Sequence, residues 1–86
     1  MGMSDATMRK RVQDFILENL LLGDRGRMPS DDASLLDSGV IDSTGVLELI
    51  EFLEEAFGIT VADDETVPEN LDGVDQVVAY AKRKQA

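Results

Sequence analysis

The chain has 86 residues, contains neither cysteine nor histidine, and carries a formal net charge of −10 at pH 7. Its length predicts a single domain covering residues 1–86. Without cysteine or histidine it lacks disulfides, thiolate metal sites and the commonest general base, so neither an enzyme nor a metal site is expected. The negative charge disfavours nucleic acid and anionic membranes, and it favours partner proteins with basic patches.

The charges are unevenly distributed along the chain. The range 28–81 holds fourteen of the eighteen acidic residues and no lysine or arginine. This pattern fits either simple solubility or an acidic docking surface. No apolar run is long enough for a signal peptide or a membrane span, which predicts a cytoplasmic monomer without membrane insertion.

The first predicted helix covers 5–22, with Ser4 as its N-cap and Gly23 as its end. A loop with turn-forming residues follows over 24–32. It extends to a connection of about twenty residues, a length that indicates a functional loop. Four apolar residues are expected to pin this loop onto the bundle: Leu35, Leu36, Val40 and Ile41.

A second helix is predicted over 43–57, between an N-cap at Asp42 and a stop at Gly58. Its apolar stripe consists of Val46, Leu49, Ile50, Leu53 and Phe57, with Leu47 beside it.

Beyond the second helix the pattern is weaker. Ile59 and Val61 alternate with polar residues, but a single short strand would have no partner. The range 63–71 fits a short third helix, or a turn with one helical turn after Pro68. A fourth helix over 73–84 places four residues in the core: Val74, Val77, Val78 and Ala81. The predicted fold is all-α, a four-helix bundle with a long loop between helices one and two and a short third helix.

The main candidate site is the Asp42-Ser43 pair at the start of the second helix. A helix N-terminus offers free N–H groups and a positive dipole end, worth about 0.3–1 kcal/mol to an anion. Gly45 is expected to leave room beside the Ser43 hydroxyl. Taken alone, an Asp-Ser pair is also ordinary helix capping.

Longer segments resemble the acyl carrier protein family. The segment 35–43 (LLDSGVIDS) is similar to the family's loop and modification site, and 53–59 (LEEAFGI) to the end of its second helix. Tyr80 within 77–81 (VVAYA) looks like part of its last helix. The resemblance implies that Ser43 carries a 4'-phosphopantetheine arm taken from coenzyme A. Asp42 would then cap the helix and be recognised by the phosphopantetheinyl transferase.

The resemblance also implies a function. Acyl or aminoacyl intermediates would be held as thioesters on the arm and delivered to partners, and the carrier would catalyse nothing itself. The implied partners are the transferase, a loading ligase or transferase, and downstream synthases with basic patches. Thr44 departs from the family pattern, where leucine or methionine is frequent, and weakens a hydrophobic contact with partners. Fatty acid biosynthesis and a specialised amino-acid or secondary-metabolism pathway therefore both remain open.

Four acidic residues of the second helix, together with Thr44, are the candidate docking residues. Glu48, Glu51 and Glu55 share one side of the helix, with Glu54 near its edge. They form either a docking surface or a merely solvated face. In the second case the alternative function is an acidic interaction module or adaptor without a prosthetic group.

A gap between helices two and three would shelter the cargo, as the family resemblance implies. Its candidate lining residues are Met28, Leu53, Ile59 and Val61. The acidic run 63–65 does not match a calcium loop, so no metal is expected there.

Overall fold

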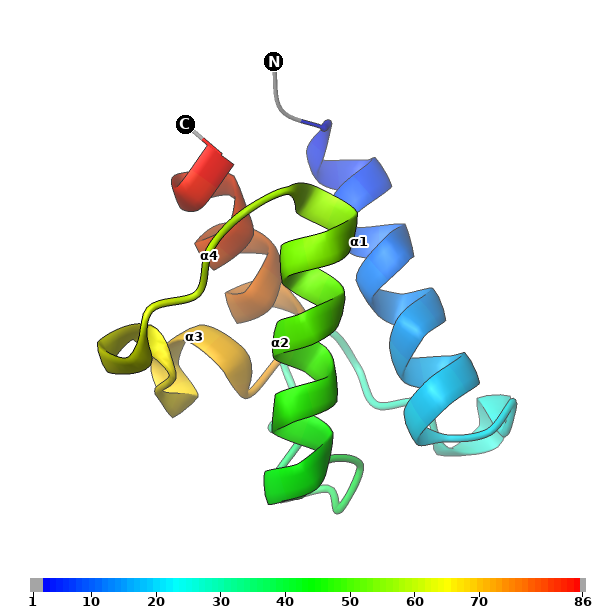
Figure 1. Ribbon diagram of the computed structural model, residues 1–86. Coiled ribbons are helices and arrows are strands. Elements are labelled where there is room, and N and C mark those ends of the chain that lie inside the picture. Colours follow the sequence, from blue (N-terminus) through cyan, green and yellow to red (C-terminus); the bar gives the residue numbers. More distant parts are fainter. Residues whose placement is uncertain (1–2, 86) are drawn as a thin grey trace.

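The computed structural model describes residues 3–85, and it contains helices and loops but no strand among these residues (Figure 1). The predicted four-helix fold, with its long loop and short third helix, is confirmed. No helix of the described part is long and apolar enough to cross a membrane. The elements are α1 (Asp5–Phe15), η1 (Ile16–Leu20), η2 (Arg25–Arg27), α2 (Ser43–Phe57), η3 (Asp63–Glu65), α3 (Pro68–Leu71) and α4 (Val74–Gln85).

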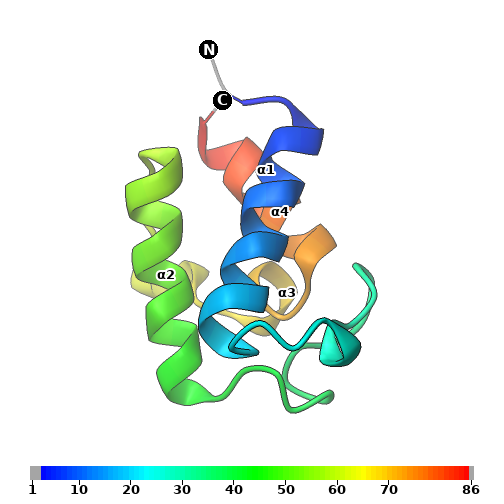
Figure 2. The ribbon, with the colours of Figure 1, turned by 90° about the vertical axis from the view of Figure 1, so that its right-hand side faces the viewer.

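The helices are arranged so that α4 packs against both α1 and α3. The start of α1 and the end of α4 lie at one end of the bundle, and α2 begins at the opposite end (Figures 1 and 2). The long loop after α1 runs to that opposite end and delivers the chain to the first turn of α2.

The predicted caps of α1 and α2 are confirmed. Ser4 Oγ accepts a hydrogen bond from the Thr7 N–H at 3.2 Å, and Asp42 Oδ1 accepts one from the Gly45 N–H at 2.8 Å. Gly58 adopts a φ of +66°, the left-handed conformation that ends many helices. These caps fix α2 at its predicted bounds.

The first helix ends earlier than predicted. Its final part is the π-helical η1, which stops at Leu20 rather than at residue 22. Leu22 and Gly23 both have positive φ values, +52° and +87°. The Gly23 N–H then bonds to the Leu17 carbonyl at 2.7 Å. The Leu22 side chain is 85% exposed, so no apolar contact holds this residue in the helix.

The core joins all four helices and the long loop. In the loop, Leu35, Val40 and Ile41 are buried as predicted, whereas Leu36 is 45% exposed and does not pin the loop. The predicted core residues of α4 are all buried. The least exposed side chains come from α1, η1, the long loop, α2 and α4, and they include Met8, Val12, Ile16, Leu35, Leu49, Leu53, Val74, Val77 and Tyr80.

The region between α2 and α4 follows the second predicted alternative, a turn followed by one helical turn from Pro68. Glu65 organises it, because its Oε1 accepts hydrogen bonds from the Tyr80 hydroxyl at 3.0 Å and from Lys84 Nζ at 2.9 Å. The Lys84 ammonium lowers the pKa of Glu65, with help from the N–H of Ala62 and from Tyr80. Burial, reinforced by the Glu65 carboxylate, raises the pKa of Tyr80 to about 12.

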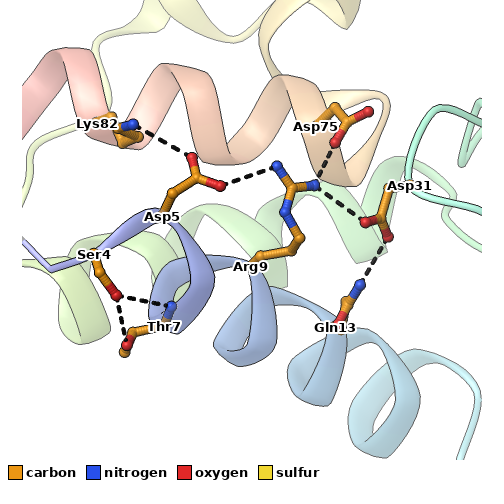
Figure 3. A network of polar contacts seen from close by, with 8 residues as sticks. All are labelled: Ser4, Asp5, Thr7, Arg9, Gln13, Asp31, Asp75 and Lys82. Atoms are coloured by element: carbon orange, nitrogen blue, oxygen red, sulfur yellow. Dashed lines mark hydrogen bonds and ion pairs between the residues drawn. The ribbon is translucent and has the colours of Figure 1, made fainter.

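An ionic cluster around Arg9 ties α1 to α4 and to the long loop (Figure 3). The guanidinium lies 3.2 Å from Asp5 and 3.1 Å from Asp31, and it also pairs with Asp75. Lys82 adds a contact to Asp5 at 3.3 Å. Hydrogen bonds from Arg9 and Lys82 hold the pKa of Asp5 below its usual value. The start of α1 is therefore fastened to α4 by charge as well as by apolar packing.

Candidate functional site

Ser43 is the first residue of α2, and its side chain is exposed. Its hydroxyl makes no hydrogen bond within residues 3–85, so the oxygen is free to react or to accept a modification. The long loop leads to the first turn of α2, which lies at the end of the bundle opposite the start of α1 (Figure 2). A bulky partner could therefore approach this hydroxyl from solvent.

Asp42 accepts hydrogen bonds from two of the backbone N–H groups at the start of α2 and leaves two others without a partner in the described residues. Its side chain accepts from the Gly45 N–H, and its carbonyl accepts from the Val46 N–H at 2.9 Å. The N–H groups of Ser43 and Thr44 make no hydrogen bond within the described residues. These groups and the helix dipole favour an anion at Ser43, while the Asp42 carboxylate opposes it by like charge.

Gly45 does not leave room beside Ser43, which corrects the expectation from the sequence. It is buried, and a Cβ built on it would lie 2.9 Å from Ile41 Cγ1 and 3.5 Å from Leu20 Cδ2. Two residues correspond to about 200° of rotation around an α-helix, so Gly45 faces inward where Ser43 faces outward. The glycine allows the first turn of α2 to pack closely against η1 and the loop.

A cavity of about 510 Å³ adjoins Ser43, between the start of α2, the long loop and α3. Leu36 and Leu47 line it and are 45% and 63% exposed, values high for leucine. Both leucines were missed as site residues. For Leu47 the sequence held a signal, because its spacing of four from Ser43 places these two residues on one face of the helix. The remaining lining is mostly apolar and comprises Ile41, Val46, Thr66, Val67, Pro68, Leu71 and Asp72.

The cavity lies between the second and third helices, where a gap was predicted, but none of the four predicted cargo-lining residues borders it. Leu53 and Ile59 belong to the buried core, since their side chains are 0% and 8% exposed. Met28 borders a different hollow, on the α1 side with Arg25 and Lys10. The periodicity of α2 identifies its inward face, but it does not show at which end of the helix the packing leaves space.

The predicted docking residues form an exposed face on α2. Thr44, Glu48, Glu51 and Glu55 are all exposed, and no salt bridge within residues 3–85 involves these glutamates. The three glutamates border a shallow hollow that they share with Phe15, Asn19 and Phe52.

Glu54 behaves differently from the other glutamates of α2. It is half-buried, and its Oε2 accepts a hydrogen bond from the Val61 N–H at 3.0 Å. The carboxylate therefore holds the segment after Gly58 against the helix. Among the described residues, no group of three or more potential metal ligands is close enough to hold an ion.

Comparison with known proteins gives a consistent family. An "acyl carrier protein" from Akkermansia muciniphila is 34% identical over 83 residues, which cover 96% of this chain and 99% of the relative. A "D-alanyl carrier protein" from Streptococcus suis is 38% identical over 64 residues, covering 74% and 78%. Another D-alanyl carrier protein, from Abiotrophia defectiva, is 38% identical over 55 residues, covering 64% and 70%. No family model matches the chain.

Proposed function

The chain belongs to the family of acyl and D-alanyl carrier proteins, and we propose that its Ser43 carries a 4'-phosphopantetheine arm derived from coenzyme A. It is a carrier rather than an enzyme. The arm supplies a thiol, on which cargo is held as a thioester. We further propose that residues 1–86 act as one carrier domain, monomeric and cytoplasmic.

The observation that carries this proposal is the exposed, unbonded Ser43 hydroxyl at the start of α2, beside an apolar cavity. The residues around Ser43 suit an attached phosphopantetheine group. The free N–H groups of Ser43 and Thr44 suit the negative charge of a phosphodiester, and the cavity offers a place for an apolar cargo. Asp42 caps the helix and stands next to Ser43, where a transferase would recognise it.

The lining of the cavity favours an acyl cargo over an aminoacyl one. An aminoacyl thioester brings an ammonium group, and Asp72 is the one charged residue among the described lining residues. Both Asp72 carboxylate oxygens already accept hydrogen bonds, from Ser34 and from the Leu36 N–H. We expect an octanoyl cargo to raise the unfolding temperature more than a D-alanyl cargo, and equal shifts would count against an acyl preference.

Docking would use the exposed side of α2. Glu48, Glu51 and Glu55 have carboxylates without a salt-bridge partner in the described residues, which suits basic patches on transferases, ligases and synthases. Glu54 would contribute less, because its carboxylate is used within the fold. Weak, electrostatically steered binding would let the carrier leave each partner quickly.

Intact mass spectrometry tests the attachment site. Incubation of the apo-protein with coenzyme A and a broad-specificity phosphopantetheinyl transferase should add one phosphopantetheine group per chain. Ser43→Ala should add none, and it should keep its fold because the Ser43 hydroxyl makes no hydrogen bond within residues 3–85.

Ser38→Ala is the matched control. This second serine belongs to the same loop-to-site segment, but its hydroxyl donates to the Leu35 carbonyl at 3.2 Å. Its variant should gain the full mass. A wild-type protein that starts unmodified and stays so would instead favour the acidic adaptor without a prosthetic group.

A further inference from the structure

Asp72, at the junction between α3 and α4, makes a group of hydrogen bonds to the loop before Ser43. Its carbonyl accepts from the Leu35 N–H at 2.7 Å. Its carboxylate accepts from the Leu36 N–H at 2.8 Å and from the Ser34 hydroxyl at 2.6 Å. Ser34 Oγ in turn accepts from the Asp37 N–H at 3.0 Å. Four consecutive loop residues thus depend, directly or through Ser34, on Asp72.

These hydrogen bonds position Leu36, which forms one wall of the cavity. Leu36 and Asp72 both line the cavity beside Ser43, and they belong to segments 36 residues apart in the chain. Leu36 is 45% exposed, so apolar burial alone holds its side chain weakly. Its buried neighbour Leu35 anchors the loop. The Leu36 backbone is held by two hydrogen bonds, from its N–H to Asp72 and from the Gly39 N–H to its carbonyl at 3.1 Å, and the first is the one that reaches across to the α3–α4 junction.

Resting on the proposed function, we infer that Asp72 is a positioning residue: its carboxylate holds the wall formed by Leu36 closed over cargo attached through Ser43. Asp72 touches no reacting atom in this role. It acts through the Leu36 backbone, and its loss would open the cavity and expose the thioester to water. The same contact would let a partner release cargo by displacing the loop at a single point.

Two measurements on Asp72→Ala test the inference. The first is hydrogen exchange of the Leu36 amide in the apo-protein, which should accelerate about tenfold or more, because a hydrogen bond to a charged group is lost. The second is hydrolysis of an octanoyl thioester on the modified protein. It should become several-fold faster and approach the rate of free octanoyl-pantetheine.

Two further variants separate positioning from general damage. Asp72→Asn keeps an oxygen for the Leu36 N–H and an amide that can donate to Ser34 Oγ, so it should restore most of both effects. Asp37→Ala also removes one carboxylate, from the loop that Asp72 contacts, but the Asp37 side chain makes no hydrogen bond or ion pair within residues 3–85. It should leave both rates as in the wild type.

Each unexpected result has a defined meaning. The positioning role would be overturned if the Leu36 amide exchanged at the wild-type rate in Asp72→Ala. It would also be overturned if this amide exchanged as fast in Asp72→Asn as in Asp72→Ala. Faster exchange with unchanged thioester hydrolysis would reduce Asp72 to a structural residue and also overturn the inference. If Ser43 accepts no arm at all, the proposed function fails, while the exchange rates still decide whether Asp72 holds the loop.

Discussion

The α1–α4 side of the molecule and the α2 side use their charges in opposite ways. Every salt bridge within residues 3–85 involves a residue of α1 or α4, and none involves α2. Around Arg9, three carboxylates gather on one guanidinium (Figure 3). Along α2, the exposed carboxylates face only solvent and each other. Charge stabilises the first side, whereas on the second the like charges have no ion-pair partner within residues 3–85 and oppose folding.

The sequence explains this division. Lysine and arginine are absent from 28–81, so neither α2 nor the segment between α2 and α4 contains a basic residue. The basic residues at the two ends of the chain share acidic partners such as Asp5, because α1 and α4 pack together (Figure 1). Four experiments test this contrast.

The largest effect is expected on the α4 side, at alkaline pH. The pKa of Tyr80 is raised from 10.0 to about 12 in the folded protein, because burial and the Glu65 carboxylate disfavour the phenolate. A raised pKa gives stability that is complete below pH 10 and is lost as the pH rises toward 12. Urea unfolding should show a loss of up to about 2 kcal/mol across this window. Tyr80→Phe should lack that loss, and an identical pH profile would contradict this account.

Breaking the Arg9 cluster should have the next largest effect. Arg9→Met leaves Asp5, Asp31 and Asp75 close together without their shared cation. We expect a loss of about 1–2 kcal/mol, or roughly 5–10 °C in unfolding temperature. Lys10→Met is the control, because Lys10 makes one exposed pair with Asp14 and should contribute only a few tenths of a kcal/mol. Equal losses in the two variants would show that the cluster adds nothing beyond a single pair.

Neutralising the exposed face of α2 should act in the other direction. Replacing Glu48, Glu51 and Glu55 by glutamine relieves like-charge pairs and should stabilise the protein by about 0.5 kcal/mol. Phosphopantetheinyl transfer should need more carrier, seen as a higher KM. Glu54→Ala should instead destabilise by about 1 kcal/mol, because the Val61 N–H loses its acceptor. A lower unfolding temperature in the triple variant than in the wild type would show that these glutamates stabilise the fold.

Salt should produce the smallest change. Screening of the net charge of −10 should raise the unfolding temperature by a few degrees between low and moderate salt. The triple glutamine variant should gain less, since part of its repulsion is already removed. A wild-type unfolding temperature that stays flat or falls over this range would indicate that the ion pairs of the α1–α4 side outweigh the repulsion along α2.

Local signals in the sequence predict the fold well where they agree. Asp42 and Gly58 enclose one amphipathic stripe, and α2 has the predicted bounds because cap, stripe and stop all favour the same helix. The end of α1 was less well defined. Leu22 has an apolar side chain that suits a helix, but nothing in the fold packs against it, and it turns out of the helix instead.

The candidate site was predicted only in part, because its shape depends on contacts between distant segments. The exposed serine beside an N-cap follows from residues adjacent in sequence. The inward direction of Gly45 depends on Leu20 and Ile41, and the cavity depends on the loop meeting α3. Likewise, Glu54 looks like its neighbours in the sequence, and only the return of the chain at Val61 sets it apart.

The placement of α2 has a practical consequence for handling the protein on a surface. The start of α1 and the end of α4 share one end of the bundle, and the first turn of α2 lies at the other (Figures 1 and 2). A protein immobilised through a linker joined to either terminal helix would present Ser43 away from the support. Surface plasmon resonance with such a chip could therefore follow the arrival of partners at the serine without shielding by the matrix.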